Sequence, residues 1–175
     1  YYYDVTPLSS PRSSKPHVSP AQAKSNGPKY AFATLVSPNY LEDADQNDLE
    51  TDDYFLSARV LNYQLLHSNK TRYHDSSVPF LVLTLPRVGK NKIKILESEG
   101  ATVIPVEHLQ ADWIKAPLPQ WEGLLSKLFL WSYTDYDKIL FVDADVYLIE
   151  SFNGIFEDEA AQPQVTKEKE TQPQD

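Results

Sequence analysis

The sequence predicts an α/β fold in which helices cover both faces of a parallel β-sheet. Along residues 29–160, short apolar runs typical of strands alternate with longer segments of helical periodicity. The strand runs are apolar throughout, which is the pattern of parallel strands that are buried on both faces. In such sheets, ligands bind beyond the carboxyl ends of the strands. The residues that follow each strand are therefore the first candidates for function.

The first half of this pattern begins with a strand predicted over 30–36, an apolar run bounded by prolines. A helix is predicted over 52–68, where Asp52 or Asp53 can cap its first turn. The side chains at helical spacing that are expected to form its stripe are Phe55, Leu56, Arg59, Val60, Tyr63 and Leu66, with Arg59 at the edge.

The second half continues the alternation of strands and helices. The predicted elements are a strand over 78–86, a helix over 91–100, a strand over 102–106, a helix over 121–133 and a strand over 138–142. Gly100 is suited to ending the second helix. In the third helix, Leu124, Leu128 and Trp131 are expected to share one apolar stripe.

The two ends of the chain lack the pattern of a folded core. Residues 1–28 are rich in Pro and Ser without periodicity, which predicts a flexible linker or stalk. Residues 161–175 are polar and are expected to be a truncated loop. The chain contains no Met and begins with Tyr-Tyr-Tyr-Asp, so we expect missing sequence upstream. A membrane anchor in that upstream part would not be visible here.

Composition excludes several classes of function. The net charge of −9 argues against binding of nucleic acid through a basic face. Without Cys, the chain can form neither a disulfide framework nor a cysteine metal site. No apolar run reaches the ~18 residues of a membrane span. The acidic stretch 42–53 is interpreted as a solvated loop, because its carboxylates lack the spacing of a calcium loop.

Two carboxylates, Asp143 and Asp145, follow the last predicted strand. Side chains alternate in extended backbone, so both acids are expected to point the same way, with Ala144 opposite. Convergent carboxylates repel unless a cation lies between them, and Mg²⁺ or Mn²⁺ prefers such oxygen ligands while keeping positions for substrate phosphates. The residues predict a metal–diphosphate site. The alternative is a turn or helix cap built from two Asp residues.

The segment "LSKLFLWSYTDYDKILFVDADVYLI" resembles the D-x-D region of glycosyltransferase family eight, the glycogenin-like family. The segments "YAFATLVS" and "KILESEGATVIPVE" also fall in the family's order, and the resemblance covers residues 29–160, most closely with the fungal branch. It implies a GT-A-type Rossmann-like fold and a hexosyl- or N-acetylglucosaminyltransferase. The implied donor is a UDP-sugar with Mn²⁺ (or Mg²⁺), and the acceptor is a glycan or protein that the sequence does not identify.

Matching the family's motifs implies a set of contacts to the metal and diphosphate. Asp145 would bind the metal, and Asp143 would bind the metal or the ribose, with the Ala144 backbone near the ribose. Lys127 would reach the donor phosphates or sugar, although it could instead extend to solvent beside the apolar stripe. Lys115 is a weaker candidate for a phosphate contact. No residue is assigned as a catalytic nucleophile.

The resemblance also implies contacts to the nucleoside. Leu35 and Ser37, at the end of the first strand, would approach the uridine. Tyr54 matches a family tyrosine that stacks on uracil, and the alternative is an ordinary residue of an amphipathic helix. His67 and His74 are interpreted as surface residues near a helix end.

The resemblance stops after residue 160, where family members have a second half with acceptor contacts and a later metal-binding histidine. No histidine follows His108 here. We therefore expect a GT-A domain that is incomplete at its C-terminus and weakly active or inactive alone. A non-catalytic nucleotide-binding module is the first alternative. A D-x-D phosphohydrolase is less favoured, because that family has Thr or Val where Tyr147 stands.

The location of the protein is predicted only from indirect signs. The fungal branch is often anchored in the secretory pathway, and Asn69-Lys70-Thr71 matches the acceptor pattern for N-glycosylation. These signs favour the Golgi or another secretory-pathway lumen, with the cytoplasm as the alternative.

Overall fold

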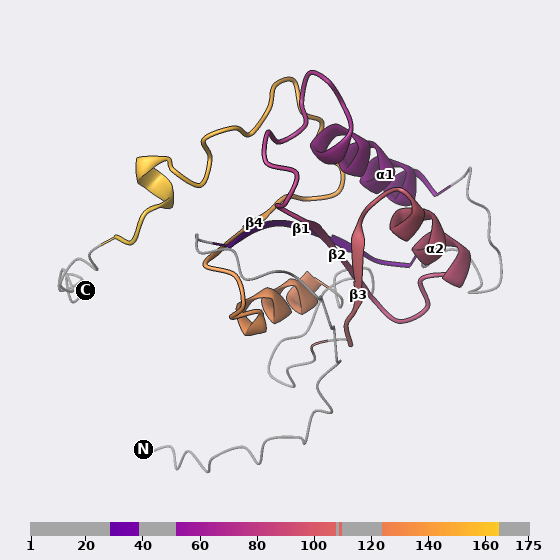
Figure 1. Ribbon diagram of the computed structural model, residues 1–175. Helices are drawn as coiled ribbons and strands as arrows, with labels where there is room; N and C mark the ends of the chain where they lie inside the picture. Colours follow the sequence, from indigo (N-terminus) through magenta and orange to yellow (C-terminus); the bar gives the residue numbers. More distant parts are fainter. Residues whose placement is uncertain (1–28, 39–51, 108, 110–123, 165–175) are drawn as a thin grey trace, which may run out of the picture.

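A computed structural model describes residues 29–38, 52–107, 109 and 124–164 (Figure 1). The predicted linker over 1–28, most of the acidic stretch 42–53 and the end of the polar tail lie outside the described residues. The elements in chain order are β1 (Tyr30–Val36), α1 (Asp53–Leu66), β2 (Phe80–Thr84), α2 (Lys90–Ser98), β3 (Thr102–Pro105), the 3₁₀ helix η2 (Leu124–Ser132), β4 (Lys138–Phe141) and the 3₁₀ helix η3 (Glu159–Ala161).

The four strands form one parallel sheet in the order β3-β2-β1-β4. In its register, Phe32 of β1 lies opposite Phe80 of β2 on one side and Leu140 of β4 on the other. The predicted α/β class with a parallel sheet is confirmed, and the topology is consistent with a Rossmann-like GT-A fold. The order also places β1 between two strands that come later in the chain, β2 and β4.

Helices lie on both faces of the sheet, as Figure 1 shows with α1 and α2 on one side and η2, in orange, on the other. On the α1 and α2 face, Phe32 and Phe80 pack with Phe55 and Leu96. On the η2 face, the intervening residues Ala31, Ala33 and Leu35 pack with Leu81, Leu83, Phe129 and Leu130. Successive strand residues therefore enter two separate apolar clusters, because side chains in a strand alternate between faces.

Helix α1 begins at the predicted cap, since the Asp52 side chain accepts a hydrogen bond from the Phe55 backbone N–H at 3.0 Å. The predicted apolar stripe is wrong in part, because Val60 is 45% exposed and Tyr63 is 59% exposed. The buried positions are Phe55, Ala58, Leu61, Asn62, Gln64 and Leu65. The spacing of large apolar residues does not identify this face, because the buried face contains the small Ala58 and the amides of Asn62 and Gln64, which bond to backbone partners.

The helix predicted over 121–133 is described from Leu124 and is a 3₁₀ helix rather than an α-helix. Its predicted stripe is also wrong, because Trp131 is 80% exposed and Leu128 is exposed. A 3₁₀ helix repeats every three residues, so the inward positions become Ser126 and Phe129, joined by Leu130. An α-helical spacing therefore selected the wrong face.

The chain after β4 returns to the α1 side of the sheet. Phe156 is buried there, and its ring stacks on Tyr30 with the two centroids 4.4 Å apart. The Lys138 ammonium donates a hydrogen bond to the Phe156 carbonyl oxygen at 2.6 Å. In the described parts of the chain, no helix is long and apolar enough to cross a membrane.

Candidate functional site

The candidate site lies at the carboxyl end of the sheet, where β1 and β4 are neighbours. From β1 the chain goes through α1 to β2 on one side of β1, and it reaches β4 on the other side only later. This reversal of direction is a topological switch point, at which open α/β sheets bind ligands beyond the strand ends. Ser37 follows β1, and Val142 continues β4 by donating its N–H to the Ala33 carbonyl oxygen at 2.8 Å. The acids Asp143 and Asp145 come next.

Asp143 and Asp145 lie in a turn rather than in extended backbone. β4 ends at Phe141, and the Val146 N–H donates to the Asp143 carbonyl oxygen at 3.1 Å, which closes a turn over 143–146. The assumption of strand alternation is therefore wrong for this segment. Burial still alternates, because Ala144 is 0% exposed and belongs to the core of the α1 face, while both acids are exposed. The buried Ala144 therefore holds the turn against the core, and the carboxylates of Asp143 and Asp145 remain at the surface.

Tyr54 connects the start of α1 with both strand ends. Its hydroxyl donates a hydrogen bond to the Leu35 carbonyl oxygen at 3.3 Å. Burial raises the pKa of Tyr54, the negative charges of Asp143 and Asp145 raise it further, and a backbone hydrogen bond from Ala144 lowers it. Both carboxylates therefore lie close enough to the Tyr54 hydroxyl to act on its ionisation. This side chain is 36% exposed, so part of its ring faces solvent.

Lys127 approaches this edge of the sheet from the η2 face. Its ammonium lies over the Phe141 ring, 5.4 Å from the centroid, and the side chain is exposed. Phe141 precedes Asp143 by two residues, so Lys127 lies near the end of the strand that delivers the acids. Its ammonium has no ion pair among the described residues, which leaves a positive charge that a bound anion can use.

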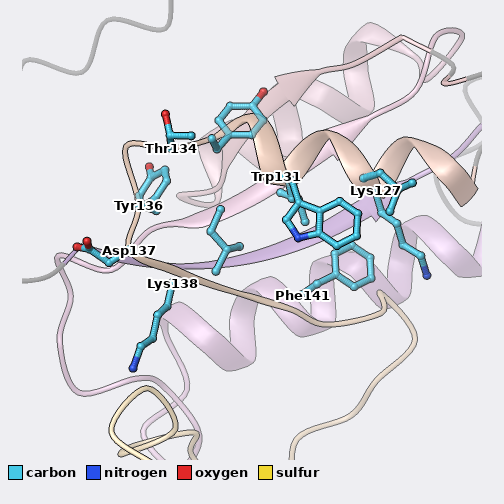
Figure 2. A pocket seen from close by; sticks show the side chains of 11 residues that line it. Lys127, Trp131, Thr134, Tyr136, Asp137, Lys138 and Phe141 are labelled. Atoms are coloured by element: carbon cyan, nitrogen blue, oxygen red, sulfur yellow. The ribbon is translucent and has the colours of Figure 1, made fainter. Parts of the chain in front are cut away.

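Lys127 also lines a hollow of about 530 Å³ between η2 and β4. Figure 2 shows Lys127, Trp131 and Phe141 toward one end of it and Tyr136 and Asp137 toward the other. The lining is mainly aromatic and aliphatic, and it also contains the polar side chains of Lys127, Thr134, Asp137 and Lys138. The hollow runs along β4 from the end near the acids to the opposite end of the strand.

The other predicted site residues have different surroundings. The Leu35 side chain is buried in the cluster on the η2 face, so its backbone carbonyl, already bonded to Tyr54, is the group that lies at the site. Ser37 is half-buried directly after β1. Lys115 lies outside the described residues. His67 and His74 are exposed, as predicted, and they contact the Glu99 carbonyl oxygen and Asn153 respectively.

Sequence reasoning missed a buried ion pair that fixes the start of α1. The Lys92 ammonium contacts an Asp52 carboxylate oxygen at 2.5 Å, and both residues are buried. Asp52 therefore caps α1 and is neutralised by α2 at the same time, two residues before Tyr54. A signal was present in the sequence, because Lys92 lies one helical turn before Leu96 and hence on the buried face of α2.

The acids fit the binding of a hard divalent cation by the chemistry of their donor set. Two exposed carboxylates in one turn supply the one or two carboxylates that Mg²⁺ commonly takes from a protein, with phosphates and water as the remaining ligands. Within the described residues, no group of three Asp, Glu or His side chains forms a complete metal cage. The donor set therefore suits a metal that is shared with a bound diphosphate.

No family model matches the sequence. It is 30% identical over 115 residues to an uncharacterised protein of Schizosaccharomyces pombe, covering 62% of this chain and 30% of that one. It is 33% identical over 112 residues to mouse glycogenin-1 (62% and 32% covered) and 26% identical over 84 residues to galactinol synthase 4 of Arabidopsis thaliana (47% and 25%). The chain spans about a third of the length of the first two relatives. At low identity, its similarity is to glycosyltransferases.

Proposed function

We propose that this chain is the donor-binding part of a glycosyltransferase that uses a UDP-sugar and a divalent cation held by Asp143 and Asp145. The observation that carries the proposal is the pair of exposed acids, held directly after β4 by the buried Ala144, at the switch point of a parallel sheet. Similarity to glycosyltransferases supports the class of reaction. The proposal includes Mn²⁺ as the preferred metal, transfer of a hexose or N-acetylglucosamine to a glycan or protein, and a Golgi or other secretory-pathway location.

The residues of the site are proposed to bind different parts of the donor. Asp143 and Asp145 hold the metal, which when bound neutralises the diphosphate and stabilises the charge that develops on the leaving group. The Lys127 ammonium supplies a second positive charge from the η2 face. The exposed part of the Tyr54 ring offers a surface on which uracil can stack, and Ser37, directly after β1, would approach the uridine.

For this chain alone, we propose donor binding with little or no transfer. The chain aligns with about a third of its first relatives, so residues that contact an acceptor in a whole transferase are expected outside the matched part. A non-catalytic nucleotide-binding module is the second candidate, favoured by the same short coverage. Incubation with radiolabelled UDP-glucose, UDP-galactose and UDP-N-acetylglucosamine tests both candidates. Slow release of UDP and sugar by this chain would reject the non-catalytic module, and robust release would also contradict weak activity.

Calorimetric titration of UDP into the chain, with and without Mn²⁺, tests the donor site itself. We expect binding that depends on Mn²⁺ and is lost in Asp145→Asn, which removes the charge at nearly constant shape. Glu150→Gln is the matched control, because Glu150 is an exposed carboxylate in the same segment and lies outside the proposed site. Binding that ignores Mn²⁺, or equal binding by Asp145→Asn, would reject the metal–diphosphate site.

A further inference from the structure

Gln64 makes a two-point contact with the segment that follows the acids. Its side-chain amide N–H donates to the Leu148 carbonyl oxygen at 2.8 Å, and the Leu148 N–H donates to the Gln64 amide oxygen at 3.0 Å. Both residues are buried, and they are 84 positions apart in the sequence. One side chain of α1 thus satisfies both backbone groups of Leu148, which would be costly to bury without partners.

This contact is the second of two fixed points that enclose the acids. The first is Val142, whose N–H donates to the Ala33 carbonyl oxygen in β1. Between Val142 and Leu148 lie the turn, its buried Ala144 and both carboxylates. Within the described residues, 146–150 belongs to no strand, so the sheet itself does not hold the far side of the turn.

The same helix also contacts the near side of the turn. The buried Ala144 of the turn belongs to the same core cluster as Phe55 and Ala58 of α1. Gln64, near the end of α1, holds Leu148. The backbone that carries the acids therefore packs against α1 at Ala144 and is hydrogen-bonded to it at Leu148, and α1 is itself held by the Asp52–Lys92 pair at its start.

We propose that Gln64 is a positioning residue that keeps Asp143 and Asp145 in the geometry required for metal binding. This inference rests on the proposed function, because it assigns Gln64 a role in the same metal–nucleotide site. Gln64 does not reach the metal; it acts through the backbone of Leu148. Outer partners that orient metal ligands typically change metal affinity roughly 10–100-fold when they are removed, and the loss of this contact is expected to fall in that range.

The first test compares Gln64→Leu with Asn62→Leu. Asn62 is a second buried amide on α1, and its side-chain N–H donates to the Glu99 carbonyl oxygen at 3.1 Å, far along the sequence from the acids. Both variants lose a buried amide, so both are expected to lose stability in urea unfolding. Only Gln64→Leu is expected to weaken the Mn²⁺ dependence of UDP binding, measured as the Mn²⁺ concentration at half-maximal binding.

The second test, Gln64→Glu, keeps the shape of the side chain and makes its contact with Leu148 depend on pH. A protonated glutamic acid donates and accepts as the amide does, whereas an ionised one presents an oxygen to the Leu148 carbonyl. Burial beside that carbonyl raises the pKa of such a group. Relative to the parent at the same pH, the Gln64→Glu variant should bind Mn²⁺–UDP weakly at about pH 8 and recover at about pH 6.

The outcomes separate this inference from the proposed function. If the parent chain shows no Mn²⁺-dependent UDP binding, the donor site and the role of Gln64 are both rejected. If the parent binds and Gln64→Leu binds equally well, or if Asn62→Leu weakens binding as much, only the positioning role is rejected. The positioning role is also rejected if the affinity of Gln64→Glu relative to the parent does not change with pH. This measurement can be made even if Gln64→Leu fails to fold.

Discussion

Among the described residues, the two faces of the sheet differ in how completely they are packed. On the α1 and α2 face, Phe32, Phe55 and Phe80 are fully buried in one cluster that also contains Ala144 and Leu148. On the η2 face, Trp131 is 80% exposed beside the hollow of about 530 Å³. The α1 side has a hollow only at its β4 edge, where about 440 Å³ is lined by residues that include Leu140, Ile155 and Phe156 among the described residues. The packed face carries the backbone of the acids, and the open face carries Lys127.

This difference separates residues that build the site from residues that are left available to a ligand. Asp52 and Lys92 neutralise each other within the packed face. Both the amide N–H and the amide oxygen of Gln64 are bonded to Leu148. Lys127, by contrast, rests on the half-buried Phe141 ring and keeps its charge at the surface. The stability of the described residues should therefore depend on the packed face, while ligand affinity depends on charged groups at the edge between the two faces.

The largest expected effect contrasts two phenylalanines. Phe32→Ala should destabilise the chain by about 3–5 kcal/mol, because it removes a fully buried ring that contacts Tyr73, Phe152 and Phe156. Phe141→Ala should cost less than half as much, since Phe141 is only half-buried on the open face. Urea unfolding followed by circular dichroism measures both values. Equal losses would show that the η2 face is as tightly packed as the other.

The next contrast is between two lysines. Lys92→Met leaves Asp52 buried without its partner and should cost about 3–5 kcal/mol of unfolding free energy. Lys127→Met removes an exposed contact with an aromatic ring and should cost only about 0.5–1 kcal/mol. The effect on UDP affinity should not follow the effect on stability. Lys127→Met should weaken UDP binding although the chain remains stable. A stable Lys92→Met variant would contradict a structural role for the buried pair.

A smaller effect distinguishes the ring of Tyr54 from its hydroxyl. If the ring stacks on uracil, Tyr54→Ala should weaken UDP binding by about 1–3 kcal/mol. Tyr54→Phe keeps the ring and loses the hydroxyl, with its contacts to the Leu35 carbonyl oxygen and the Ala144 backbone, so UDP affinity should fall less than in Tyr54→Ala. Titrations of both variants beside the parent measure the two contributions. A loss in Tyr54→Phe as large as in Tyr54→Ala would assign the role to the hydroxyl instead.

The smallest expected effect is a dependence of stability on alkaline pH. Burial raises the pKa of Tyr73 above 10.0, and the charges of Glu157 and Asp75 add to the rise. The unfolded chain then loses this proton first, so stability is fully present below pH 10.0 and falls as pH rises through the folded pKa. Tyr73→Phe should show a shallower loss of unfolding free energy above that pH. An identical slope in parent and variant would indicate that Tyr73 ionises equally in both states.

The sequence alone was sufficient to predict the parallel α/β sheet, because each strand is a short apolar run that must be buried on both faces. It also predicted the position of the acids, since a carboxylate pair directly after a buried strand has to lie at the edge of the sheet. The Asp52 cap was predictable for the same reason, as it depends on neighbours in the chain. These features arise from local interactions and from the period of the backbone.

Tertiary structure decided which residues hold the site together. The partners of Gln64 and Asp52 lie 84 and 40 positions away in the sequence, so no local pattern identifies them. The buried face of α1 and the inward face of η2 depend on which surfaces the sheet presents, and apolar spacing alone selected other residues. The turn at Asp143 likewise forms where the backbone leaves β4, next to β1, and packs against α1. Apolar periodicity reports what must be buried, whereas the geometry of packing determines which polar groups meet.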